Sequence, residues 1–184
     1  LRIATEIYLK RAVVGGVDRV FEMNRNFRNE GMDSSHSPEF TSLEAYEAYS
    51  DYNGMAELTR DLIQQAARDA FDLSEGEEIV RLADGTEYDL SGQWDRIDLY
   101  GSTSEALGEE VTVETPRETL VKYAERIGLE VDDYAVSGKI VEDIFEELVA
   151  SKLWAPTFVY DFPEDTSPLT RYHRSRPGLT EKWD

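Results

Sequence analysis

The side chains of residues 27–46 are of the types that bind a nucleotide together with a cationic small molecule. This stretch, FRNEGMDSSHSPEFTSLEAY, contains Arg28, Phe40, Glu44 and Tyr46. An arginine binds phosphate through paired donors, an aromatic ring stacks on a base, and a carboxylate pairs with an ammonium group. The stretch therefore predicts a site for a nucleotide and a cationic small molecule.

These side chains can act together only if one face of a β-hairpin carries them. Alternate residues of a strand point to opposite faces of a sheet. One face of the first strand would carry Glu22, Asn24, Asn26, Arg28 and Glu30, and the other face Phe21, Met23, Arg25 and Phe27. In the returning strand, one face would carry Phe40, Ser42, Glu44, Tyr46 and Ala48. If the two polar faces coincide, they present the arginine, the ring and the carboxylates to one cleft.

The composition indicates one globular domain without disulfides. A length of 184 residues with 40% hydrophobic residues is enough for one ordinary core. The absence of cysteine excludes disulfides and thiolate metal sites, and it fits a cytoplasmic location. No stretch reaches the roughly 18 apolar residues of a membrane span, and no segment has the pattern of a signal peptide. We therefore expect no association with a membrane.

The net charge of −20 bears on the partners of the chain. Nucleic-acid-binding surfaces normally carry an excess of lysine and arginine, because neutralising phosphates drives the binding. We therefore expect weak or no nucleic-acid binding by this chain, with any contact to RNA made mainly elsewhere in the protein. The excess of acids is otherwise explained by a solubilising surface.

Periodicity and turn signals predict an α+β fold with antiparallel strands and flanking helices. The expected helices cover 5–14, with Thr5 as its cap, 54–72, 116–127 and 138–152, and the expected strands cover the first hairpin, 79–90 with a turn at Asp84-Gly85, 94–100 and 157–162. In the second helix, Met55, Leu58, Leu62, Ala66 and Ala70 would lie on one stripe.

The hairpin resembles motif 2 of the class II aminoacyl-tRNA synthetases and is most similar to that of lysyl-tRNA synthetases. The matching segments are FRNE at 27–30, HSPEFT at 36–41 and LEAY at 43–46, flanked by LRIATE at 1–6 and YLKR at 8–11, with PTF at 156–158, SPL at 167–169 and LTEKW at 179–183 downstream. The resemblance covers most of the chain and is weakest between about 73 and 136. A lone Arg-x-Glu would mean little, but this ordered set is specific.

The resemblance implies that the chain is the central part of a class II catalytic domain, truncated at both ends. Residues 1–72 would form the motif 2 region, about 73–155 an insertion, and 156–184 the segment leading to the third motif. The first motif and the anticodon-binding barrel would precede Leu1. The third motif, with the glutamates that hold Mg²⁺, would follow Asp184, so this chain alone is expected to be inactive and to hold no metal.

For ATP, the resemblance assigns roles to four residues. Arg28 would bridge the α-phosphate and the lysine carboxylate, and it is the expected catalytic residue. Phe40 would stack on adenine, while Glu30 and His36 would lie at the adenine edge and the γ-phosphate region. The residue types alone also allow a salt bridge of Arg28 with Glu30 or Glu22, a core position for Phe40 and a loop hydrogen bond for His36.

For lysine, the resemblance assigns Glu44 and Tyr46 to the ε-ammonium group and Glu6 to the α-ammonium group, with Arg28 on the carboxylate. A buried ammonium must be paired, so a lysine pocket requires a carboxylate at its far end. Glu6 would also be explained by the helix dipole, because it lies in the first turn of a helix.

The spacing of the sequence gives His173 no partner. Arg171, Arg174 and Arg176 would balance neighbouring acids or face the tRNA acceptor end.

The implied activity is that of a lysine–tRNA ligase. Such an enzyme uses ATP and Mg²⁺ to form lysyl-adenylate, transfers the lysyl group to tRNA(Lys), and works as a cytoplasmic homodimer in protein biosynthesis. Two alternatives remain at this point. One is a paralogue that transfers lysine to a protein or a lipid, and the other is a non-catalytic binding module on the same scaffold.

Overall fold

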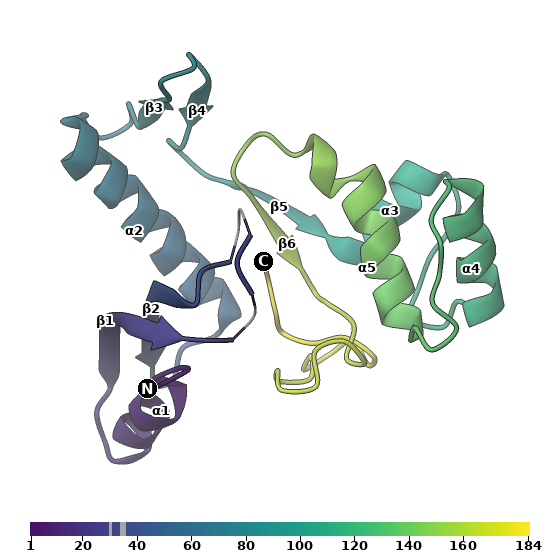
Figure 1. Ribbon diagram of the computed structural model, residues 1–184, viewed down its shortest axis with the longest axis horizontal. Coiled ribbons are helices and arrows are strands. Elements are labelled where there is room, and N and C mark those ends of the chain that lie inside the picture. Colours follow the sequence, from purple (N-terminus) through teal and green to yellow (C-terminus); the bar gives the residue numbers. More distant parts are fainter. Residues whose placement is uncertain (30, 34–35) are drawn as a thin grey trace. The chain divides into compact units, whose positions relative to one another are not determined.

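The computed structural model describes residues 1–29, 31–33 and 36–184, and the chain divides into two compact units, Leu1–Asp51 and Tyr52–Asp184. The first unit contains helix α1 (Glu6–Val14) and the antiparallel strands β1 (Arg19–Phe27) and β2 (Glu39–Glu47). Figure 1 shows these elements in purple and blue. The hairpin predicted from the alternating pattern is confirmed.

Helix α1 packs against both strands of the hairpin. It ends at Gly15 and Gly16, and Gly16 has a φ of +100°, a conformation that favours glycine. The prediction that the Thr5 side chain caps this helix is wrong, because Thr5 makes no side-chain cap hydrogen bond. The Thr5 hydroxyl instead bonds to groups on the hairpin, which the sequence of the helix start cannot reveal.

The second unit contains a parallel strand pair that the sequence did not predict. Strand β5 (Asp95–Asp98) pairs in parallel with β6 (Thr157–Tyr160), whereas hairpins were expected throughout. Parallel pairing requires a long crossover connection. Three helices supply it, α3 (Leu99–Leu107), α4 (Arg117–Arg126) and α5 (Ser137–Leu148), followed by the 3₁₀ turn η1 (Ala150–Lys152). The α+β class holds, but the described strands form three two-stranded sheets.

Helix α3 was also missed, since residues 94–100 were expected to continue as a strand. The strand ends at Asp98, whose Oδ1 accepts a hydrogen bond of 2.7 Å from the amide of Gly101 and so caps the new helix. Leu99 and Tyr100 are then buried in the helix rather than in a sheet. Aspartate is a favoured N-cap residue, a signal that the strand prediction for 94–100 did not take into account.

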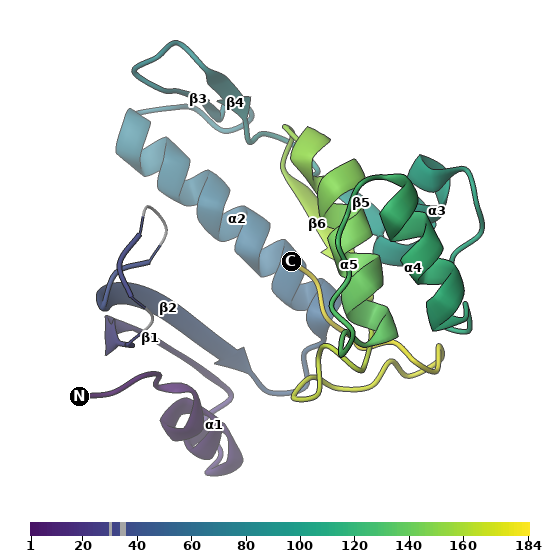
Figure 2. The same cartoon turned by 45° about the vertical axis from the view of Figure 1, so that its right-hand side comes forward.

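The amphipathic helix predicted over 138–152 is present as α5, which ends at Leu148 rather than at 152 and builds the main core of the second unit. Ile140, Val141 and Ile144 are at most 1% exposed and pack with Leu99 and Leu120. Figure 2 shows α5 lying against α3 and α4, in agreement with the contacts between these helices. Residues of all three helices pack in this core, and the apolar surface that they bury stabilises this part of the chain.

The helix predicted over 54–72 is present as α2 (Tyr52–Phe71), but its apolar stripe is not its buried side. Leu58 and Leu62 are 44% and 46% exposed, and the buried residues of the helix are Ala56, Gln64 and Ala67. A row of polar side chains on α2 (Arg60, Gln64 and Arg68, here called the polar ridge) instead binds the segment that carries a hairpin. This hairpin consists of β3 (Ile79–Arg81) and β4 (Glu87–Asp89). The hairpin itself, with its turn at Gly85, is as predicted.

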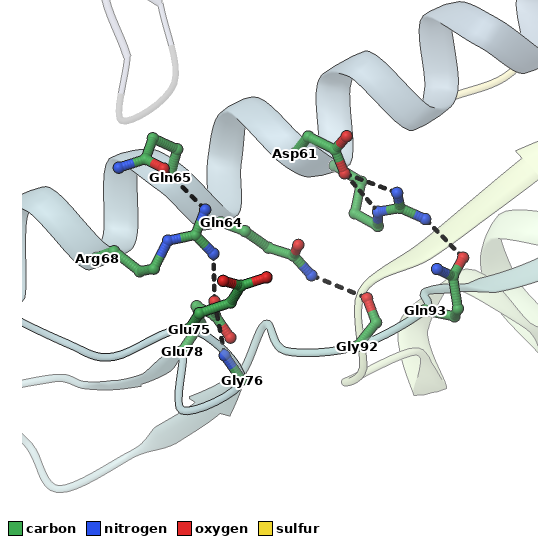
Figure 3. A pocket seen from close by; sticks show the side chains of 10 residues that line it. Asp61, Gln64, Gln65, Arg68, Glu75, Gly76, Glu78, Gly92 and Gln93 are labelled. Carbon is green, nitrogen blue, oxygen red and sulfur yellow. Dashed lines mark hydrogen bonds and ion pairs between the residues drawn. The ribbon is translucent and has the colours of Figure 1, made fainter.

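Three side chains at helical spacing form this ridge (Figure 3). Arg60 donates a 2.5 Å hydrogen bond to Gln93, Gln64 donates to the carbonyls of Leu90 and Gly92, and Arg68 pairs with Glu78. They line a polar cavity of about 620 Å³. None of the ten residues drawn in Figure 3 was predicted to bind lysine or ATP. The ridge therefore serves to attach the 75–93 segment to the helix.

The arginine-rich loop of residues 171–176 is paired with carboxylates, as the charge-balance interpretation predicted. Arg174 donates to both oxygens of Glu181, with its Nη2 at 2.9 Å from Oε2, and Arg176 lies 2.8 Å from Asp98. Glu181 is 8% exposed. The hydrogen bonds from Arg174 lower the pKa of Glu181 to about 2, against the opposing effect of its burial.

His173, which was given no partner, does have partners. Its Nδ1 accepts hydrogen bonds from the amides of Ser175 and Arg176, at 3.1 and 3.0 Å. Its Nε2 lies 3.5 Å from the Tyr52 hydroxyl and 3.7 Å from Asp161. The histidine therefore shapes the loop through contacts that sequence spacing could not reveal.

Replacing Glu181 by glutamine is expected to reduce stability in a pH-dependent way. A carboxyl whose pKa falls from its usual 4.5 to about 2 on folding contributes on the order of 3 kcal/mol above pH 4.5, and this contribution disappears as the pH falls from 4.5 towards 2. Urea unfolding at pH 7, 4.5 and 3 should show Glu181→Gln well below the native chain at pH 7, with the difference between the two falling to about half or less by pH 3. The control is Glu109→Gln, whose partner Arg126 lies 3.2 Å away on the surface. A Glu181→Gln gap that stays constant from pH 7 to pH 3 would contradict the assignment.

Candidate active site

The register of the hairpin brings the predicted site residues to one face. Glu22 is opposite Glu44, Asn24 is opposite Ser42, and Asn26 is opposite Phe40. Residues that face each other across a ladder project to the same side of a sheet. The coincidence of the two polar faces is therefore confirmed. Glu30, which was assigned to ATP, lies outside the described residues.

Arg28 and Phe40 form one contact at the end of the hairpin where the loop connects the two strands. The Arg28 guanidinium carbon lies 5.1 Å from the centroid of the Phe40 ring, within cation–π range. Arg28 is exposed, its Nε donates a 3.3 Å hydrogen bond to the Ile3 carbonyl, and its amide donates to the Pro38 carbonyl. Glu22, the alternative partner, pairs with Arg2 at 2.9 Å instead. The group suited to phosphate thus lies beside the ring suited to a base.

Glu44 is held at three points. Its Oε1 accepts hydrogen bonds from the Thr5 amide at 3.0 Å and from the Thr5 hydroxyl at 3.1 Å, and its Oε2 accepts one from the Tyr46 hydroxyl at 2.8 Å. Burial raises the pKa of Glu44, but the hydrogen bonds from Thr5 and Tyr46, with the charge of Arg28, outweigh it and lower the pKa overall. The carboxylate is therefore charged and fixed in direction, as the binding of an ammonium group requires.

Tyr46 is the partner of this carboxylate. Burial, followed by the hydrogen bond to Glu44 and the negative charges of Glu44 and Glu6, raises the pKa of Tyr46. The phenol therefore keeps its proton at neutral pH and acts as a donor to Glu44. The sequence placed these two residues on one strand face, and the structure joins them.

Glu6 and His36 are exposed and have local partners. Glu6 forms an ion pair with Lys10 one turn further along α1. The His36 amide donates to Asp33 at 2.7 Å, and its Nδ1 lies 2.9 Å from the same carboxylate. These contacts agree with the helix-turn and loop interpretations of the two residues. Their roles in binding lysine and ATP remain predictions.

Two residues at this face, Thr5 from the start of α1 and Asn24 from β1, were not assigned any role in the site from the sequence. Thr5 is 1% exposed and Asn24 is 8% exposed, and the Asn24 amide nitrogen donates a 3.1 Å hydrogen bond to the Thr5 hydroxyl. Alternation placed Asn24 on the polar face, so its position was available from the sequence. The approach of Thr5 depends on how α1 packs against the hairpin, for which the sequence carries no signal.

Within the ranges 1–29, 31–33 and 36–184, no group of three or more histidine or acidic side chains is arranged to hold a metal ion. In the same ranges, no helix is both long enough and apolar enough to span a membrane.

The chain belongs to the class II tRNA synthetases, since the family model described as "tRNA synthetases class II (D, K and N)" matches residues 1–184. Its curated relatives include lysine–tRNA ligases from Kineococcus radiotolerans and Mycolicibacterium gilvum, each 58% identical over 185 and 186 residues. These alignments cover 100% of this chain and 36% of each relative, so the chain spans about a third of their length. A lysylphosphatidylglycerol biosynthesis bifunctional protein LysX from Gordonia bronchialis is 48% identical over 188 residues, which cover all of this chain and 16% of that relative.

Proposed function

We propose that the protein containing this chain is a lysine–tRNA ligase. In the first step, an oxygen of the lysine carboxylate attacks the α-phosphorus of ATP and pyrophosphate leaves. In the second step, the terminal ribose hydroxyl of tRNA(Lys) attacks the carbonyl of the adenylate and AMP leaves. The observation that carries this proposal is the Glu44 carboxylate, which is charged and held at three points on the same hairpin face as Phe40.

In the first step, Arg28 is the proposed catalytic residue. No protein nucleophile is needed, because the reaction requires alignment and neutralisation of charge on the phosphate oxygens. A guanidinium remains charged and offers paired donors, so it can hold the α-phosphate and the lysine carboxylate in line. The contact of Arg28 with Phe40 supports a single site in which phosphate and adenine are bound side by side.

The remaining residues are proposed to bind the two substrates. Glu44 and Tyr46 receive the ε-ammonium group of lysine and Glu6 the α-ammonium group, which requires Glu6 to exchange its partner Lys10 for the ligand. Glu30 and His36 contact the adenine edge and the γ-phosphate region. The described residues do not fit the Mg²⁺ that accompanies ATP, and its protein ligands are proposed to lie outside them.

The first test is pyrophosphate exchange by the whole protein, assayed with each of the standard amino acids. We expect exchange that depends on lysine and falls sharply for the other amino acids. Absence of exchange with every amino acid, from a protein that is folded and binds ATP, would contradict the proposal and favour a non-catalytic module on the same scaffold.

A second candidate is transfer of the activated lysine to a lipid. It is supported by the 48% identity to the Gordonia protein, whose name refers to lysylphosphatidylglycerol biosynthesis. Incubating the whole protein with labelled lysine, ATP and either tRNA or phosphatidylglycerol shows which of the two acceptors receives the lysyl group.

Because the net charge of this chain is −20, we infer that tRNA is held mainly by other parts of the protein. A homodimer and a cytoplasmic location remain predictions.

A further inference from the structure

The Glu44 carboxylate has little freedom left for a ligand. A carboxylate offers about four acceptor positions on its two oxygens. Thr5 donates two hydrogen bonds to Oε1, and Tyr46 donates one to Oε2. An arriving ammonium group therefore finds its open acceptor position on Oε2. The position of this opening depends on the donors that hold the rest of the carboxylate.

The direction of the Thr5 hydroxyl is itself set by Asn24. The amide nitrogen of Asn24 can only donate, and it donates to Thr5 Oγ1 at 3.1 Å. A hydroxyl has a single hydrogen, and with Asn24 occupying one of its lone pairs that hydrogen is directed to Glu44 Oε1, 3.1 Å away. Asn24, Thr5 and Glu44 therefore form a chain of hydrogen bonds that runs in one direction.

The burial of this chain argues for a role beyond the stability of the hairpin. Thr5 is 1% exposed and Asn24 is 8% exposed. Among the described residues, the amide oxygen of Asn24 has no hydrogen-bond partner. Leaving a buried acceptor unpaired is costly, so an apolar residue would stabilise this position better. What Asn24 supplies in return is the donor to Thr5.

We propose that Thr5 and Asn24 are positioning residues for lysine, which hold Glu44 so that one oxygen is left to receive the ε-ammonium group. This inference rests on the proposed function. It assigns to the start of α1 and to the middle of β1 a part in selecting the amino acid. Neither residue touches the ligand, and both act through Glu44.

The test uses pyrophosphate exchange by the whole protein carrying Thr5→Val, which keeps the shape and the backbone donor but removes the hydroxyl. We expect the KM for lysine to rise about tenfold, as for loss of one hydrogen bond to a charged group, with the KM for ATP unchanged. Thr5→Ser, which retains the hydroxyl, should restore a KM close to that of the native protein. The matched control is Thr41→Val, an exposed threonine on the opposite face of the same hairpin.

Norleucine, which is lysine without its ε-ammonium group, separates positioning from general disturbance of the site. As a competitive inhibitor it should keep its inhibition constant in Thr5→Val, because it makes no contact with Glu44. A parallel loss of norleucine binding would overturn the inference. Asn24→Asp reverses the donor to Thr5 and should likewise raise the KM for lysine, so the test stands even if Thr5→Val does not fold.

The outcomes distinguish this inference from the proposed function. Absence of lysine-dependent exchange in the native protein would overturn both. Exchange that is lost in Glu44→Gln but has an unchanged KM for lysine in Thr5→Val and Asn24→Asp would overturn the positioning role alone. A raised KM for lysine with unchanged ATP and norleucine binding in both variants would support it.

Discussion

Replacing Arg28 by alanine in the whole protein is expected to lower lysine-dependent pyrophosphate exchange by about 100- to 1,000-fold, the effect of removing a donor aimed at charge that develops in the transition state. Both proposed ligands of Arg28, the α-phosphate and the lysine carboxylate, approach each other during the reaction. Its loss therefore removes alignment as well as charge. We expect the fall mainly in kcat, because the proposed contacts of the substrates with Phe40 and Glu44 would remain.

The matched control for Arg28→Ala is Arg25→Ala. Arg25 lies on the opposite face of β1, pairs with Glu39 at 2.7 Å and has a largely exposed side chain. Its removal tests whether any arginine on this hairpin affects exchange through stability or overall charge. Equal losses in the two variants would contradict a catalytic role for Arg28, as would an Arg28→Ala protein that retains exchange at the native rate.

Replacing Glu44 by glutamine is expected to raise the KM for lysine by roughly 30- to 5,000-fold, the range for removing one charge of a desolvated pair. Glutamine has the size of glutamate, but it has one acceptor oxygen and no charge to offer an ammonium group. The amide would also place a donor opposite Thr5 or Tyr46, both of which donate to this side chain. The KM for ATP should change little, since Phe40 and Arg28 are intact.

Glu47→Gln is the control for Glu44→Gln. Glu47 lies on the same strand and pairs with Arg19, which is opposite it in the ladder. Its side chain projects to the other face, so we expect its loss to leave the KM for lysine unchanged. Measuring initial exchange rates over a wide range of lysine concentrations decides the matter. A Glu44→Gln protein with the native KM for lysine would remove Glu44 from the lysine site.

The proposed site would combine two kinds of recognition on one short hairpin. Arg28 and Phe40 lie at its loop end, where Arg28 is exposed and Phe40 is half-buried. Glu44 and Tyr46 lie further along β2, half-buried and joined by a hydrogen bond. A ligand assembly with an anionic end and a cationic end can therefore extend along one strand face. The two-residue period of the strand keeps these side chains on the same side of the sheet.

Several features of the second unit could not be predicted because they depend on contacts between distant segments. Strands β5 and β6 pair in parallel although some sixty residues separate them, and neither segment alone specifies its partner or direction. The buried side of α2 is decided by Gln64, which bonds to the carbonyls of Leu90 and Gly92. An apolar pattern does not include a glutamine, so the stripe that contains Leu58 and Leu62 does not identify the buried side of this helix.

The sequence by itself determined the hairpin, its polar face and the residue types of the proposed site. Alternation is a local property of a strand, and the ordered segments around Arg28, Phe40 and Glu44 are specific enough to indicate the family, which the match over 1–184 confirms. Only the tertiary structure decided how Glu44 is held. Thr5 reaches it because α1 packs against the hairpin, and Asn24 then directs the Thr5 hydroxyl. These hydrogen bonds join residues that are 19 positions apart (Asn24 and Thr5) and 39 positions apart (Thr5 and Glu44). They depend on how whole elements pack, which the local sequence pattern does not indicate.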